Sequence, residues 1–98
     1  MQTPFIISTA IWFTDGKEYP HQPTNITRGI VITGRRHHNC FMTMKTLSGK
    51  LIDDWKGHVQ GFITSDNKFV NRRQAAGIAY KAGQINEPTD RLFSEDLY

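Results

Sequence analysis

Hydrophobic and polar positions change their spacing several times along the chain, and each change marks an expected element. Residues 5–13 form a mostly apolar run, and the β-branched stretch 29–34 forms a second, as is typical of strands. Two further runs, 58–65 and 68–70, meet at the polar residues Ser65-Asp66-Asn67-Lys68, which predict a hairpin turn. The pattern therefore predicts four strands.

Two other segments, 36–47 and 72–82, have the spacing of amphipathic helices, with apolar residues every three or four positions. The first stripe is Cys40, Phe41, Met44 and Leu47, and the second is Ala75, Ile78, Ala79 and Ala82. Asn71 followed by Gln74 is the sequence pattern of a capping box, and Gly83 predicts where the second helix ends.

Strands and helices in this order predict a single compact α+β domain over residues 1–98, with a small, mostly antiparallel sheet and two helices packed on one face. The last segment, 86–98, has no period but carries the apolar residues Leu92, Phe93, Leu97 and Tyr98. We therefore expect an irregular C-terminal tail that docks on its own subunit or on a neighbouring one.

Composition limits the class of protein. Hydrophobic residues make up 38% of the 98 residues, so the core is thin and a homodimer or higher oligomer is expected. One cysteine excludes an internal disulfide and a cysteine-rich zinc site. The apolar run 5–13 is too short to cross a bilayer, so no membrane partner is expected.

Charge is distributed unevenly. Residues 1–85 carry eleven Lys/Arg against five Asp/Glu, a balance of +6, whereas residues 86–98 have a balance of −3. A basic body suits a phosphate-bearing partner. The acidic tail and a total of only +3 argue against binding of extended nucleic acid, which requires a broad basic face.

The first helix is expected to begin with Arg35, Arg36, His37 and His38, an unusual choice because helix N-termini disfavour cations. An anion bound there would make the arrangement favourable, since N–H groups and basic side chains would face one charge. The alternative is a solvated face, in which the basic side chains extend into water and His37 packs against Phe41.

The remaining candidate ligand-binding residues are spread over three segments. Arg72 and Arg73 repeat the basic start at the second helix, and Gln60 precedes Gly61, a glycine within a strand that marks close approach of a backbone or ligand. Glu95 and Tyr98 in the tail complete the predicted set. Aromatic residues such as Trp12 could stack on a base, although core packing is the simpler explanation for Trp12 and Trp55.

Catalysis, if it occurs, is assigned to His37 and His38, because histidine serves as acid or base near pH 7. We predict a metal-independent phosphodiesterase reaction with no cofactor, since the spacing of His37 or His38 from Asp53, Asp54, Glu95 and Asp96 matches no metal motif. The same residues would serve a non-catalytic sponge that sequesters the nucleotide. A third hypothesis is an interaction protein that blocks a host enzyme.

The ordered motifs of the last two thirds of the chain resemble a family of small bacteriophage proteins. The motifs are Arg36-His37-His38, Gln60-Gly61-Phe62, Phe69-Val70 with Arg72, Ala75-Ala76, Ala82-Gly83-Gln84-Ile85, and Leu92 to Tyr98. The chain departs from the pattern at Asn71 and Gln74, where the family has acidic residues, so its local charge is more positive.

This resemblance implies a phage-encoded protein acting in the cytoplasm of the bacterial host, but it supplies no activity. Small phage proteins of this kind often counter host defence, for example by binding or destroying the nucleotide signal of a defence system. By this analogy the expected partner is a small phosphorylated (cyclic) nucleotide.

Overall fold

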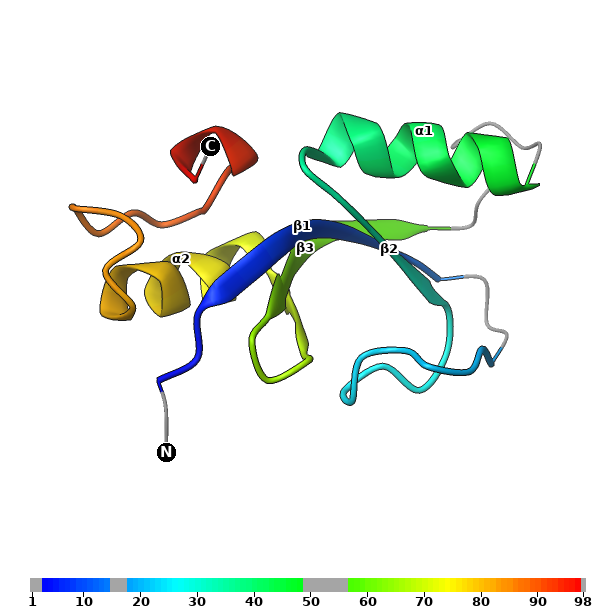
Figure 1. The fold of residues 1–98 in the computed structure, drawn as a ribbon, viewed down its shortest axis with the longest axis horizontal. Helices are drawn as coiled ribbons and strands as arrows, with labels where there is room; N and C mark the ends of the chain where they lie inside the picture. The colour runs from blue at the N-terminus through cyan, green and yellow to red at the C-terminus, as the bar shows by residue number, and fades with distance from the viewer. Residues whose placement is uncertain (1–2, 15–17, 49–56, 98) are drawn as a thin grey trace.

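The structure, a computed structural model, describes residues 3–14, 18–48 and 57–97 (Figure 1). Its elements are β1 (Ile6–Phe13), β2 (Ile30–Gly34), α1 (His37–Ser48), β3 (His58–Thr64), β4 (Phe69–Asn71), α2 (Arg72–Lys81) and the short 3-10 helix η2 (Ser94–Asp96). Every predicted strand and helix is present, with ends that differ by at most one residue. The α+β fold class is confirmed.

The four strands form one antiparallel sheet in the order β2-β1-β3-β4. The central strand β1 pairs along one edge with β2, from Thr9 opposite Gly34 to Phe13 opposite Ile30, and along the other with β3. Because side chains alternate across a strand, Ile11 and Phe13 lie on one face and Ala10 and Trp12 on the other.

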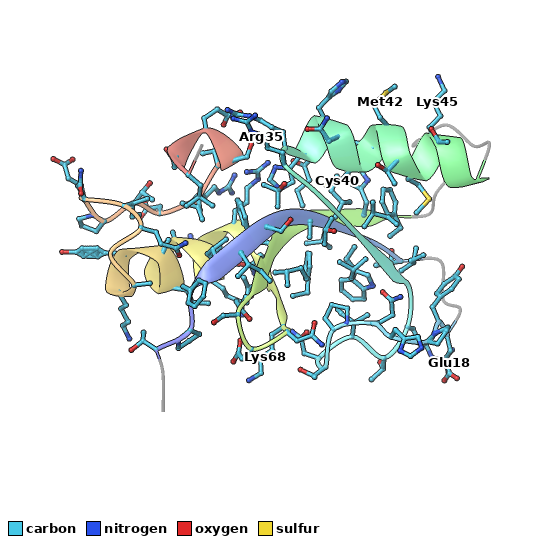
Figure 2. The ribbon with its side chains drawn as sticks, in the orientation of Figure 1. Glu18, Arg35, Cys40, Met42, Lys45 and Lys68 are labelled. Carbon is cyan, nitrogen blue, oxygen red and sulfur yellow. The ribbon has the colours of Figure 1, made fainter. Side chains whose placement is uncertain are left out.

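Both helices pack on the face that carries Ile11 and Phe13, as predicted. Helix α1 covers β2 and β1, and Figure 2 shows Cys40 pointing to the sheet while Met42 and Lys45 point away. Helix α2 covers β3 and β4. The buried residues under α1 are Ile11, Phe13, Ile32, Cys40 and Met44, and those at α2 are Ile6, Phe62, Val70, Ala75, Ala76, Ala79 and Leu92.

The opposite face of the sheet is covered in part by the loop before β2. Ile26 from this loop packs against a cluster that contains Trp12, Val59 and Phe69. Asn25 also closes the sheet edge: its Nδ2 donates to the Phe69 carbonyl (2.6 Å), and its Oδ1 accepts from the Phe69 N–H (2.8 Å). This side chain satisfies backbone groups of the edge strand β4 that would otherwise face water or another chain.

The C-terminal tail docks on the body of its own chain (Figure 1). Leu92 is fully buried in the cluster at α2, and its N–H donates to the Arg72 carbonyl (2.9 Å). Near the other helix, Arg36 and Glu95 form an ion pair (3.4 Å). The tail therefore contacts the first residues of α2 and the entrance to α1.

The local turn signals are also confirmed where the structure describes them. Asn67 adopts a positive φ of 62° in the predicted hairpin, and Gly83 a φ of 76° just after α2. Several sequence expectations lie outside the described residues. They concern Trp55, Asp53, Asp54 and Tyr98.

Candidate functional site

Arg72, the first residue of α2, is held between β3, α1 and the tail. Its Nη2 donates to the Gln60 side-chain oxygen (2.6 Å) and lies 3.3 Å from His37 Nδ1, while its Nη1 donates to the Leu92 carbonyl (2.9 Å). The Phe93 ring lies against the guanidinium, with 4.6 Å between the ring centroid and Arg72 Cζ. The capping box of Asn71 and Gln74, present as predicted, starts α2 directly after β4 and so fixes this position.

His37, the first residue of α1, is buried, and its ring bonds at both nitrogens. Nε2 lies 2.9 Å from the Gly61 carbonyl oxygen, which can only accept, so Nε2 carries the proton and Nδ1 accepts from Arg72. The ring also meets Phe62 edge-on at 5.3 Å. These partners assign the neutral tautomer, as in a packed histidine, although the packing residue is Phe62 and not the expected Phe41.

Burial changes the acid–base properties of both residues. It lowers the pKa of His37; the hydrogen bond to Gly61 opposes this shift, the charge of Arg72 adds to it, and Glu95 opposes it. Burial also lowers the pKa of Arg72. The negative charge of Glu95 raises this pKa, and the positive charge of Arg91 lowers it further. Arg72 remains a cation because guanidinium does not lose its proton in proteins.

A pocket of about 390 Å³ opens beside this cluster. The residues that line it are Gln60, Asn71, Arg72, Arg73 and Arg91. All are amides or arginines, and among the described lining residues there is no carboxylate. Arg73 and Arg91 are exposed and form no ion pair with a described residue. The pocket thus concentrates positive charge at a point open to solvent.

The structure brings together part of the predicted site. Gln60, Arg72 and Arg73 share the pocket, His37 contacts Arg72, and Glu95 is held by Arg36. Arg35 lies where the chain enters α1, as Figure 2 shows, and His38 is exposed on that helix. Tyr98 lies outside the described residues. The ring of His58 packs against the rings of Phe13 and Phe41.

Sequence reasoning missed Arg91 and Phe93 and did not foresee that the Gly61 carbonyl binds His37. Arg91 could have been found, because it precedes Leu92, which was expected to anchor the tail. For Gly61 the sequence predicted only that a backbone or ligand comes close. In the structure, a Cβ at this position would lie 2.1 Å from the Val70 carbonyl oxygen. The close approach of another backbone, the general expectation for this glycine, is therefore confirmed.

Two other chemistries receive no support from the described part of the chain. Burial raises the pKa of the Cys40 thiol to about 11, so a thiolate nucleophile is disfavoured there. No three His, Cys, Asp or Glu residues among those described gather closely enough to hold a metal ion.

None of the described helices combines the length and apolar character that crossing a membrane requires.

The chain was compared with curated proteins, solved structures and models of protein families. No curated protein and no solved structure matches the chain. The family model described as phage T4 y16D protein matches residues 5–98, which include every strand and helix of the fold. The chain therefore belongs to the phage T4 y16D protein family, a family of bacteriophage proteins.

Proposed function

We propose that this protein is a phage counter-defence protein that binds a small phosphorylated nucleotide, such as a cyclic immune signal, in the cytoplasm of the bacterial host. The observation that carries the proposal is the pocket lined by Arg72, Arg73 and Arg91. Guanidinium groups present a planar fork of donors that matches phosphate oxygens, and three of them can neutralise one or two phosphates.

The electrostatic surroundings support a phosphate at this place. Helix α2 has no acidic residue in its first turn, and the pocket wall is completed by the amides of Gln60 and Asn71. Arg72 is already oriented by Gln60 and Leu92, so binding costs little side-chain entropy there. Arg73 and Arg91 are the adaptable cations that would close on the ligand.

The geometry favours sequestration over cleavage. The Nδ1 lone pair of His37 accepts a hydrogen bond from Arg72, so the ring has no free base while this contact persists. The exposed His38 is the remaining predicted acid or base at the start of α1. Cleavage by His37 would require Arg72 to move away, which a phosphate bound at Arg72 could cause.

The decisive experiment incubates the protein with a panel of cyclic dinucleotides and cyclic ADP-ribose isomers, followed by heat release and chromatography. Intact ligand recovered only after heating supports a sponge, whereas an altered product that persists in EDTA supports a metal-independent phosphodiesterase. If no nucleotide binds, the proposal is wrong, and a protein that blocks a host enzyme becomes the explanation to pursue.

Substitution of one pocket arginine tests the site itself. Arg73→Ala should weaken binding of the captured nucleotide by about 1.5–3 kcal/mol, the range for a charge-assisted hydrogen bond. Lys81→Ala is the matched control, because it removes one exposed positive charge at the opposite end of α2. Equal losses in the two variants, measured by isothermal titration calorimetry, would assign the effect to net charge and not to this pocket.

A further inference from the structure

A second pocket, of about 350 Å³, meets the arginine pocket at Asn71, which lines both. Its lining residues are Trp12, Asn25, Ile26, Val59, Phe69, Asn71 and Gln74. Strand β4 pairs with residues 61–63 of β3, and the chain then leaves the sheet edge as α2. Residues 59 and 60 of β3 therefore have no partner in β4. Their side chains lie on opposite faces of the strand, Gln60 in the arginine pocket and Val59 in the second pocket, so the two pockets meet around this edge of the sheet.

The second pocket has flat apolar walls. The rings of Trp12 and Phe69 lie 6.2 Å apart at an angle of 60°. The Trp12 indole N–H donates to the Arg28 carbonyl (2.8 Å), which fixes the ring, while part of the side chain stays exposed. Aromatic and aliphatic walls of this kind suit a heterocyclic base, because every base has an apolar π-face.

Two amide side chains of this pocket, Asn71 and Gln74, offer hydrogen-bond donors, whereas both ends of the third, Asn25, bond the Phe69 backbone. In the capping box, Asn71 Oδ1 accepts from the Gln74 N–H (2.8 Å), and Gln74 Oε1 accepts from the Asn71 N–H (3.0 Å). Each oxygen thus already accepts one bond within the cap, and each side chain has an NH2 group that the cap does not use. No described residue accepts from these two NH2 groups, so both are available to a ligand.

Two donors select a base edge that offers two acceptors. Guanine presents O6 and N7 side by side as acceptors, whereas adenine replaces the first with an amino donor. Resting on the proposed function, we propose that the phosphate binds at Arg72, Arg73 and Arg91 while the base, a guanine, enters the pocket of Trp12 and Phe69. The protein is then selective for guanine nucleotides.

Titration of the full-length protein with GMP, AMP and ribose 5-phosphate, followed by NMR, tests this inference. GMP should bind at least tenfold more tightly than ribose 5-phosphate and severalfold more tightly than AMP. Equal affinity of GMP and ribose 5-phosphate overturns the base pocket and leaves the phosphate site intact. Tighter binding of AMP than of GMP overturns the assignment of guanine. Failure of all three ligands, together with the cyclic panel, overturns the proposed function as well.

Gln74→Glu is the sharpest variant, because a glutamate oxygen still accepts from the Asn71 N–H and keeps the helix cap. The substitution removes one donor and should reduce the ratio of GMP to ribose 5-phosphate affinity at least fivefold. The added charge repels both ligands, so the ratio isolates the contact to the base. An unchanged ratio in a variant with native circular dichroism contradicts the inference.

The Trp12 indole N–H resonance gives an independent readout, assigned with a Trp55→Phe variant. It should shift on addition of GMP and stay in place with ribose 5-phosphate. A resonance that GMP leaves unmoved at saturation overturns binding of the base beside Trp12.

Discussion

His37 connects three elements through one imidazole ring. It starts α1, donates to the Gly61 carbonyl of β3 and accepts from Arg72 of α2. A buried ring with this pair of partners is stable only when neutral, because protonation would place a second cation against the guanidinium of Arg72. His37, which the sequence suggested as an acid or base, is therefore a buried residue that holds the elements of the candidate site together.

We predict that His37 makes the protein less stable in acid. Its native pKa lies below the ordinary value of 6.5, so between these values the unfolded chain binds more protons and stability rises with pH. This contribution is fully present above 6.5 and is lost as the pH falls toward the native pKa.

Urea unfolding at pH values between 5 and 8, in steps of about half a pH unit, measures how the free energy of unfolding depends on pH. His37→Gln, which cannot be protonated, should flatten the slope, and His38→Gln, at an exposed position, should retain it. The same slope in both variants would show that another group controls the acid response.

At the scale of elements, two glycines have opposite roles. Gly61 lies in β3 where a Cβ would approach the Val70 carbonyl to 2.1 Å and the Phe69 ring to 2.7 Å. Gly77 lies in the middle of α2, is exposed, and a Cβ there would meet no atom within 4 Å. The strand requires its glycine because backbone and ring close over it, whereas the helix merely tolerates one.

Alanine at these two positions should change stability in opposite directions. Gly61→Ala should lower the free energy of unfolding by about 2–3 kcal/mol or more, because the contacts with backbone and ring cannot relax cheaply. Gly77→Ala should raise it by roughly 0.5–1 kcal/mol, since alanine loses less backbone entropy in a helix. Chemical denaturation of both variants checks this, and a loss of stability in Gly77→Ala would contradict the helical geometry described for α2.

At the scale of the whole molecule, the tail completes the site. Its residues 91–95 supply an arginine to the pocket, a buried leucine, a ring on Arg72 and a carboxylate opposite Arg36. The acidic charge of the tail and the basic charge of the body thus meet within one chain. Glu95 is an internal competitor for an anion, because its charge also acts on His37 and Arg72.

Glu95→Gln should therefore strengthen binding of the phosphorylated ligand by about threefold to tenfold, since removal of one nearby negative charge acts at short range. Stability should change little, because the Arg36–Glu95 pair is exposed, with side chains 33% and 70% accessible, and such pairs contribute about 0–1 kcal/mol. Calorimetric titration at two salt concentrations measures the effect. Weaker binding in Glu95→Gln would mean that Glu95 contacts the ligand directly.

The oligomeric state remains a prediction. The alanine stripe of α2, one reason to expect a dimer, packs inside the chain, but Phe5 and Ile7 remain exposed to 42% and 51% near the start of β1. A homodimer or higher oligomer is expected to cover this apolar surface. Light scattering at micromolar concentration should give at least twice the 11.2 kDa of one chain, and a mass of one chain would contradict the prediction.

Signals that act over a few neighbouring residues were sufficient to predict the elements. Apolar and β-branched runs predicted the strands, and helical periods predicted the helices. Asn71 with Gln74 predicted the start of α2, and Gly83 predicted its end. These signals are local because the hydrogen bonds of a helix and its caps join residues at most four or five positions apart, and a strand is recognised from the side chains of consecutive residues. The fold class followed from the order of the elements, and the basic residues at two helix starts indicated which side chains to examine.

Only the tertiary structure decided how those side chains meet. His37 finds its partners 24 and 35 positions away, in β3 and α2, and the tail brings Arg91 into the pocket. Such contacts depend on strand order, on register and on the path of the tail, which no local period encodes. The sequence therefore determined the elements and the residue types of the site, whereas chain packing decided that His37 is buried and that Asn71 stands between two pockets.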